Sequence, residues 1–384
     1  MRRSLWTASL AAGGLAILIQ LICAVAVPAA AADWPTFRGD NARTGRAATG
    51  ISAEPAVAWS VELGGSVDGS PIVLADRVYV GNSHGKLACV NAADGDVVWT
   101  TQLDGAICSA AAASENRLVV GTSRGFFYCL SLDGDVLWRR HCWDAIVGSP
   151  LIVAGRCYWG SMDGVFHAAD LESGRDAWAR KLAGGISAAP CSDGRRIFVA
   201  DEGGVVWALD PADGRVLWQY KTGCPAMGAP VLDAGALIVP LVSPTRLAPP
   251  KIPFLQTFDP GTGELKWQVV EARSVFASPV VGPGGIAYIS VEGYLSATFV
   301  RCQSLDGRRP LYKRPIGGVV DSSPAVADGR AYFGAHDGCL YVVELAGGRV
   351  LSRVKLAPKI FSSPALVGDR LFIGASDGRL YCLR

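Results

Sequence analysis

Residues 70–99 read SPIVLADRVYVGNSHGKLACVNAADGDVVW. Four short runs rich in apolar and β-branched residues are separated by turns that contain Asp, Asn and Gly; the runs are Pro71–Leu74, Arg77–Val80, Lys86–Val90 and Val97–Trp99. Runs of this length without a helical period predict four short antiparallel strands. A helical repeat of similar length would need two glycine-free runs of ten or more residues, and this stretch does not contain two.

The same unit recurs along the chain. Five tryptophans follow one another at intervals of 40, 39, 40 and 40 residues, and a sixth follows them: Trp59, Trp99, Trp138, Trp178, Trp218 and Trp267. A Ser-Pro or Ala-Pro pair opens seven units, at Ser70, Ser149, Ala189, Ala229, Ser278, Ser323 and Ser363. We expect Ser109-Ala110 to take the remaining place. Eight copies of a four-stranded unit predict an all-β fold, an eight-bladed β-propeller of four-stranded antiparallel blades.

The two ends of the repeat region predict how the ring closes. The last copy ends at Arg384 after its third strand, and Ala56–Val61 reads as a spare fourth strand before the first Ser-Pro pair. We expect this N-terminal strand to pair with Leu380–Leu383, because a closed ring leaves no strand edge unpaired. An open β-solenoid with frayed ends is the alternative.

The N-terminus has the composition of an export signal. A basic Met1–Arg3 precedes the largely apolar stretch Leu5–Val27, and Ala29–Ala32 offers a cleavage site with small residues. We therefore predict a signal peptide over residues 1–32, a leader segment over 33–55 and the propeller over 56–384. The protein is then exported to the periplasm or cell envelope, with no transmembrane span in the mature chain. A retained membrane anchor is the alternative, because the apolar stretch is long for a signal peptide.

Charge and cysteine content narrow the function classes. The chain has 36 Lys and Arg against 34 Asp and Glu, and removing the two arginines of residues 1–32 leaves 34 of each. A neutral chain without a basic run does not favour nucleic acid as a partner. We expect the protein to be a monomer. Several cysteines share a strand position with alanine, which predicts small buried thiols. Cys108 and Cys142 lie between blades and are candidates for a disulfide.

A motif within the repeat carries a family resemblance. Residues 168–178 (AADLESGRDAW) and 208–218 (ALDPADGRVLW) have Ala, Asp, Gly and Trp at the same offsets, and residues 257–267 nearly match. This pattern resembles the tryptophan-docking motif of the pyrroloquinoline quinone (PQQ)-like β-propeller repeat family. The resemblance implies that each tryptophan packs on the neighbouring blade and has a structural role; the six are Trp59, Trp99, Trp138, Trp178, Trp218 and Trp267. The leader stretch Asp33–Asp40, followed by Thr44-Gly45, is similar to W-P-x-F/Y-x-G segments that precede the first blade in secreted members.

The resemblance implies two functional branches. One contains quinoprotein dehydrogenases, which use PQQ and calcium, and the other resembles BamB, a scaffold of outer-membrane assembly. The dehydrogenases carry two adjacent cysteines beside the cofactor and are much longer, and this sequence has no such pair. The BamB-like branch implies an exported, non-enzymatic scaffold with an envelope protein as partner, no cofactor, and no catalytic or metal residues. The alternatives are a small PQQ- and calcium-dependent alcohol or sugar dehydrogenase and a carbohydrate- or other ligand-binding propeller.

One face of the ring is the predicted interaction face. In each blade, the turn between the second and third strands and the loop to the next blade lie on the same side, which we call the shared face. Loops on a rigid ring are where propellers bind. The candidate residues are Arg124, Asp163, Asp201, Glu202, Arg273, Phe276, Asp321, His336 and Phe361, together with Arg246 and Lys251 in the insertion Leu241–Pro253. A second insertion is Val291–Val300. The alternative is that the carboxylates only form turns and that the insertions are tolerated surface loops.

Overall fold

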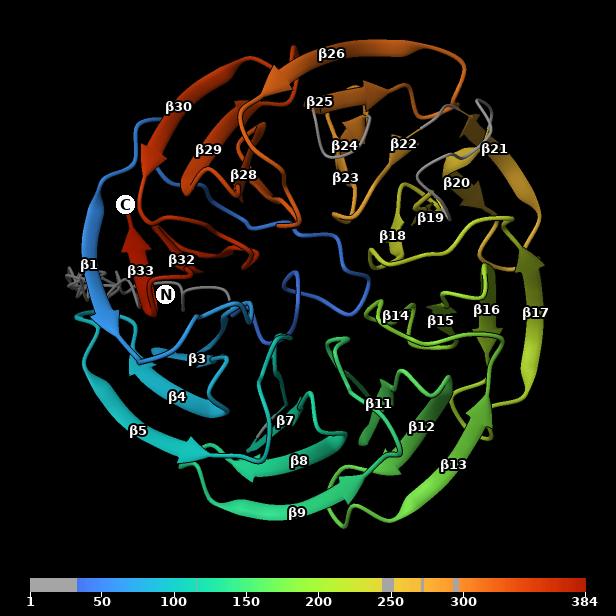
Figure 1. Ribbon diagram of the computed structural model, residues 1–384. Helices are drawn as coiled ribbons and strands as arrows, with labels where there is room; N and C mark the ends of the chain where they lie inside the picture. The colour runs from blue at the N-terminus through green and yellow to red at the C-terminus, as the bar shows by residue number, and fades with distance from the viewer. Residues whose placement is uncertain (1–32, 115, 244–251, 271–272, 293–296) are drawn as a thin grey trace, which may run out of the picture. The chain divides into compact units, whose positions relative to one another are not determined.

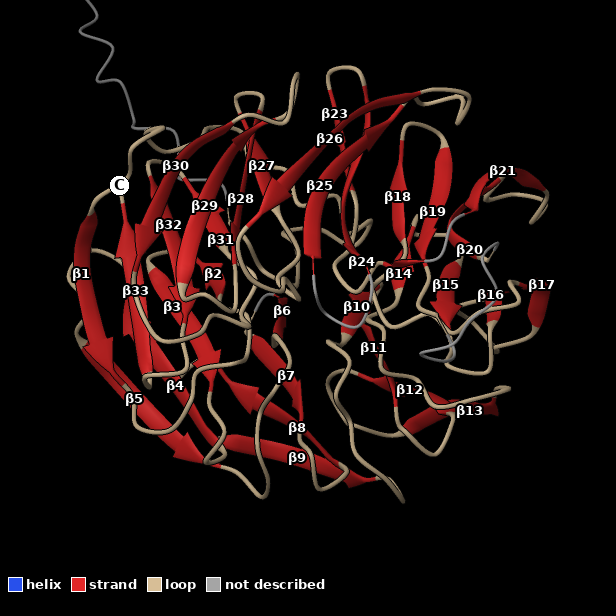
Figure 2. Ribbon diagram, turned by 45° about the horizontal axis from the view of Figure 1, so that its top comes forward, coloured by secondary structure: helices blue, strands red, loops and turns tan. Residues whose placement is uncertain are grey.

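The computed structural model describes residues 33–114, 116–243, 252–270, 273–292 and 297–384. Within these residues, eight antiparallel sheets are arranged in a ring, each with its first strand nearest the centre (Figure 1). All the regular elements of this part of the chain are strands (Figure 2). The predicted all-β, eight-bladed propeller is confirmed.

The strands of each blade are given in order from the innermost to the outermost. Blade one is β2 (Ile72–Leu74), β3 (Arg77–Gly81), β4 (Lys86–Asn91) and β5 (Val97–Gln102); blade two is β6 (Ala112–Ser114), β7 (Arg117–Gly121), β8 (Phe126–Ser131) and β9 (Val136–His141). Blade three is β10 (Leu151–Val153), β11 (Arg156–Gly160), β12 (Val165–Asp170) and β13 (Asp176–Lys181); blade four is β14 (Cys191–Ser192), β15 (Ile197–Ala200), β16 (Val205–Leu209) and β17 (Val216–Lys221). Blade five is β18 (Val231–Asp233), β19 (Ala236–Pro240), β20 (Pro253–Phe258) and β21 (Leu265–Val270); blade seven is β27 (Ala325–Ala327), β28 (Arg330–Gly334), β29 (Cys339–Glu344) and β30 (Val350–Lys355).

Blade six departs from the common plan. It contains β23 (Val280–Gly282), β24 (Gly285–Glu292), β25 (Ala297–Gln303) and β26 (Pro310–Ile316), and a fifth strand, β22 (Arg273–Ser274), pairs with the end of β24. The described parts of the insertion Val291–Val300 belong to β24 and β25. This insertion therefore lengthens a hairpin.

The N-terminal strand closes the ring. Blade eight consists of β31 (Ala365–Val367), β32 (Arg370–Gly374), β33 (Arg379–Leu383) and, as its outermost strand, β1 (Val57–Glu62). β1 runs antiparallel to β33, and the backbones of Ala56 and Arg384 exchange hydrogen bonds of 2.9 and 3.0 Å. The predicted pairing is confirmed, and the open solenoid is wrong.

Indole rings and glycines join successive blades. The indole nitrogen of Trp178 donates a 3.1 Å hydrogen bond to the carbonyl oxygen of Pro211 in the next blade. The ring lies against Gly214, whose φ of 69° suits glycine and where an added Cβ would sit 2.5 Å from the indole. The same bond to the following blade is made by Trp59, Trp99, Trp138, Trp218 and Trp267. In blade six, Tyr312 takes the place of the tryptophan, against Gly348.

The ten cysteines after residue 32 are free thiols, and all but Cys108 are buried. Cys142 lies in a core cluster, where it accepts a 3.3 Å hydrogen bond from the indole nitrogen of Trp159. It also lies 3.5 Å from Nε2 of His167. The expectation of packed thiols is confirmed, and Cys108 and Cys142 do not form a disulfide.

Candidate functional site

The leader segment crosses the centre of the ring and bonds to the innermost strands (Figure 1). Trp34 pairs with Val73 of blade one, and the carbonyl oxygen of Pro35 accepts a hydrogen bond from Ala113 of blade two. Three more leader carbonyls accept backbone bonds from blades four, five and seven, in the pairs Ser192–Asn41, Leu232–Ala42 and Val326–Gly45. The leader is therefore an internal part of the propeller.

Two buried arginines extend these contacts to blades three and six. Arg43 donates to the carbonyl oxygens of Pro190 and Pro150, at 2.9 and 2.8 Å. Arg38 donates to those of Ser278 and Pro279, at 3.0 and 2.8 Å. Both side chains are almost fully buried. Burial lowers the pKa of Arg38 to about 9 and that of Arg43 to about 10, so both are protonated at neutral pH.

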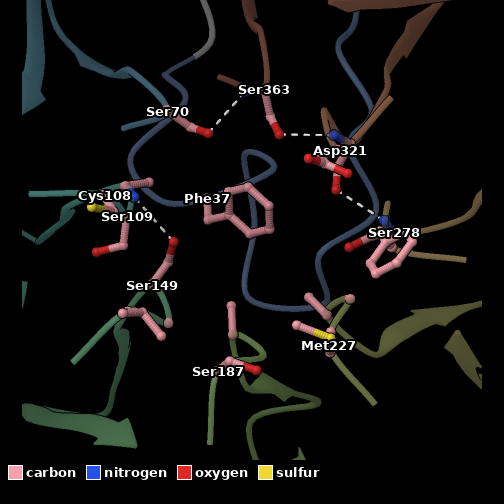
Figure 3. A pocket seen from close by; sticks show the side chains of 18 residues that line it. Phe37, Ser70, Cys108, Ser109, Ser149, Ser187, Met227, Ser278, Asp321 and Ser363 are labelled. Atoms are coloured by element: carbon pink, nitrogen blue, oxygen red, sulfur yellow. Dashed lines mark hydrogen bonds between the residues drawn. The ribbon is translucent and has the colours of Figure 1, made fainter. Parts of the chain in front are cut away.

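On the shared face, the centre of the ring forms a narrow cavity of about 150 Å³, which we call the funnel (Figure 3). Phe37 of the leader contributes its ring to the wall, and the other lining residues lie just before or at the start of the innermost strands. Phe276 and Asp321, two of the predicted interaction residues, line the funnel. Besides these, its lining includes Ser70, Cys108, Ser109, Ser149, Ser187, Met227, Ser278, Ser323 and Ser363.

Serines of the Ser-Pro pairs connect neighbouring blades around the funnel. The backbone N–H of Ser363 donates to Oγ of Ser70, and that of Ser323 donates to Oγ of Ser363 (Figure 3). Ala110 donates in the same way to Ser149, at 3.1 Å. Ala110 thus occupies the position that Ser70 holds in blade one, so the predicted place of Ser109-Ala110 in the repeat was wrong by one residue.

The described lining does not fit PQQ. This cofactor is a fused aromatic quinone with three carboxylates, whereas a cavity of about 150 Å³ holds a ligand the size of benzene. None of the described lining residues is a lysine or an arginine, and the carboxylate of Asp321 would repel an anion. Calcium takes six to eight oxygen ligands. The part of the chain that the structure describes contains no group of three acidic, His or Cys side chains that could hold a metal.

Two further predicted residues meet beside the funnel. Nε2 of His336 lies 3.0 Å from Oδ2 of Asp321, although the geometry is not that of a hydrogen bond. The ring of His336 also contacts that of Phe361, with centroids 4.5 Å apart. Elsewhere on the wall, Ser187 donates a 2.6 Å hydrogen bond to Glu202.

The other predicted residues do not join this group. Asp201 is fully buried, and its carboxylate accepts bonds from Ala183, Val205 and Trp207, so it holds its own turn and cannot contact a partner. Asp163 likewise bonds within its turn, to Ser161 and Val165. Arg124 is exposed. The backbone of Arg273 lies in β22. Arg246 and Lys251 lie outside the described residues.

Sequence reasoning missed three residues. Arg38 and Arg43 bond only to oxygens of the protein and mostly to backbone carbonyls, so no complementary side chain marks them. Trp143 is 94% exposed in the loop between blades two and three. Trp143 falls outside the regular tryptophan series, but so do the buried Trp34 and Trp159, so the spacing alone does not identify it as exposed.

A curated relative is similar over part of the chain. The outer membrane protein assembly factor BamB of Moranella endobia (strain PCIT) is 24% identical over 230 residues. The match covers 53% of this chain and 55% of the relative, so the chain spans about half the length of that protein.

Solved structures share the fold. BamB from Moraxella catarrhalis superposes with a TM-score of 0.72 at 17% identity, covering 86% of this chain and 97% of that one. A europium-containing methanol dehydrogenase superposes with a TM-score of 0.74 at 13% identity, covering 92% and 98%. Likeness at such identities establishes the architecture, and function has to be argued from the site. A family model described as "Beta-alanine-activating enzyme, beta-propeller" matches residues 63–384, and the chain belongs to this family, as a PQQ-like, BamB-like β-propeller.

Proposed function

We propose that the protein is a non-enzymatic binding or scaffold propeller of the cell envelope. The observation that carries this proposal is the funnel, which is too small for a PQQ-sized cofactor and has no cation among its described lining residues. The leader bonds across the rest of the centre, and a second cavity of about 350 Å³ lies between it and the first strands of blades two and three. We propose that the shared face around the funnel mouth is the surface used for binding.

The proposed location rests on two observations. Residues 1–32 have the composition of a signal peptide. The curated relative is named as an assembly factor for outer membrane proteins. Among the described residues, no helix is long and apolar enough to cross a bilayer. We propose export to the periplasm or envelope, a monomeric propeller, and an envelope protein as partner.

The alternatives predict different contents of the funnel. A PQQ- and calcium-dependent dehydrogenase would need cations for the cofactor's carboxylates and a carboxylate cluster for the metal, and the described lining supports neither. A carbohydrate- or other ligand-binding propeller would need a concave site lined by aromatic side chains with a few polar groups that orient the ligand. We propose that no cofactor is required and that the insertion with Arg246 and Lys251 adds contact surface to the shared face.

Matched variants on the two sides of the ring test this proposal. Met227 on the shared face and Val97 at the start of an outer strand are 44% and 45% exposed, so aspartate at either position should leave folding intact. The tagged full-length protein is cross-linked in cells and purified from the envelope fraction. We expect Met227→Asp to lower recovery of a specific envelope protein at least fivefold and Val97→Asp to leave it unchanged. Equal recovery with both variants would contradict the proposal.

A further inference from the structure

Trp143 occupies a place where the repeat needs only a small or turn-forming residue. It is the second residue after strand β9, in the loop that leads to blade three. The same place after the outer strands of four other blades holds Gly64, Asp104, Ala183 and Gly223. The fold therefore gives no packing reason for a tryptophan, and its side chain is 94% exposed.

The other described tryptophans are used by the fold. Each, apart from the buried Trp34, donates its indole N–H to an acceptor within the protein. Trp159, for example, donates to Sγ of Cys142, and Trp207 donates to the carboxylate of Asp201. Trp143 has no hydrogen-bond partner among the described residues, and both its apolar face and its N–H are available for contact.

The exposed Arg124 lies on the shared face in the turn beside this loop, and its Cβ and Cγ lie against Gly105 of the preceding interblade loop. The backbone N–H of Cys142 donates a 2.8 Å hydrogen bond to Gly125, and a Cβ added to Gly125 would sit 2.7 Å from the carbonyl oxygen of Asp144. The turn that carries Arg124 is thus packed against the loop that carries Trp143. Arg124 is exposed and has no ion pair or hydrogen bond from its side chain to any described residue.

The neighbouring Arg139 is already paired. It lies 3.2 Å from Asp104 and also covers the ring of Phe126, at 5.2 Å from its centre. The exposed carboxylate of Asp144 accepts a 2.7 Å hydrogen bond from the backbone of the following residue and has no ion pair with a described residue, so a partner's carboxylate has to bind on the Arg124 side of the patch. Arg124 has side-chain donors that are left for such a partner.

We propose that Trp143 and Arg124 form a docking patch for a segment of a partner protein that carries a carboxylate close to an apolar side chain. Tryptophan and arginine are enriched among the few residues that contribute most to binding at protein interfaces. The planar guanidinium can donate two parallel hydrogen bonds to one carboxylate. A neutral sugar would leave this charge unpaired, and a membrane surface would need more exposed apolar residues than one tryptophan. The inference rests on the proposed scaffold function and names the chemistry of its partner.

Site-specific cross-linking in cells tests the patch. Benzoylphenylalanine, a photo-reactive residue, replaces Trp143 in the full-length protein, and the cross-linked peptide is sequenced by mass spectrometry. We expect one envelope protein, joined through a segment with Asp or Glu within a few residues of the cross-link. Arg124→Glu should lower the yield at least tenfold, and Arg124→Lys should lower it less. Replacing the partner's Asp or Glu with lysine should restore the cross-linking yield of the Arg124→Glu variant.

Two control positions decide between the outcomes. Ala183 is exposed at the equivalent place in the next loop, and a cross-linker there should give at least tenfold less of the adduct. Phe361 lies elsewhere on the shared face. An adduct from position 361 without one from 143 overturns the patch but leaves the scaffold function standing. Absence of envelope-protein adducts from both positions would contradict both. An adduct from 143 with lipid, glycan or a second copy, or one insensitive to Arg124→Glu, also overturns the patch.

Discussion

The guanidinium of Arg38 donates a 2.8 Å hydrogen bond to the carbonyl oxygen of Pro279, 241 residues further along the chain. Arg43 makes equivalent bonds to Pro150 and Pro190. In repeat proteins, each unit generally contacts only its neighbours. The leader instead connects blades that do not touch each other, so it should make unfolding of the ring more cooperative.

Replacing Arg43 with methionine should destabilise the fold strongly. The change leaves the buried carbonyl oxygens of Pro150 and Pro190 without these donors, and each buried acceptor left unsatisfied costs about 1–3 kcal/mol. The free energy of unfolding is measured by urea denaturation. Arg46→Met is the matched control, because its ion pair with Asp233 is partly exposed and should contribute less than about 1 kcal/mol. Equal losses of unfolding free energy for the two variants would show that the bonds of Arg43 to the blades do not stabilise the propeller.

Truncations should separate the leader from the closing strand. Deleting residues 33–55 removes the central contacts but keeps β1, so we expect a folded protein with a lower melting temperature. Deleting residues 33–62 also exposes the edge of β33, and an unpaired edge favours aggregation. We therefore expect the longer deletion to be insoluble. Equal solubility and melting temperature for the two truncations would argue against closure by β1.

Two tryptophans should respond in opposite ways to alanine. Trp178 is half-buried against Gly214, and its loss should cost about 3 kcal/mol, the lower end for tryptophan truncation in cores. Trp143→Ala should change stability by less than about 0.5 kcal/mol, because its side chain is exposed. Thermal and urea denaturation of the two variants measure this difference. A large loss at Trp143 would mean that the residue supports the fold.

Stability should decrease in mild acid because of His167. Burial lowers the pKa of His167 below its ordinary value of 6.5, and its ring stacks on Trp159. Around that pH the unfolded state binds more protons at this residue, so its contribution to stability falls as pH falls. His167→Gln should make the stability profile between pH 7 and 5 shallower, by at most about 1.4 kcal/mol per pH unit, the limit for one proton. An unchanged slope in urea titrations would contradict this.

The blade and its closure could be predicted because their signals are local or periodic. Alternating apolar residues and Asp-Gly turns define the strands of residues 70–99. The last repeat lacks its fourth strand and Ala56–Val61 is a spare strand, which together indicate that Ala56–Val61 completes the last blade. The predicted start of the second blade was wrong by one residue, because alanines replace both the serine and the proline that open the other blades.

The centre of the ring could not be predicted in the same way. Arg38 and Arg43 bind carbonyl oxygens, which every residue carries, so nothing in the sequence identifies their partners. The burial of Asp201 depends on packing between blades, and its turn sequence resembles turns with an exposed aspartate such as Asp377. Phe276 and Asp321 were found because the shared face follows from strand direction alone.

Titration of the purified protein with PQQ and calcium tests most directly whether the funnel is a cofactor site. A ligand at a hundred times its dissociation constant adds about 2.7 kcal/mol of stability, which thermal denaturation would detect. We expect no change in melting temperature or cofactor absorbance, and no dye-linked oxidation of alcohols or aldoses above a no-protein control. A rise in melting temperature together with turnover that is lost on calcium chelation would contradict the scaffold function and establish a dehydrogenase.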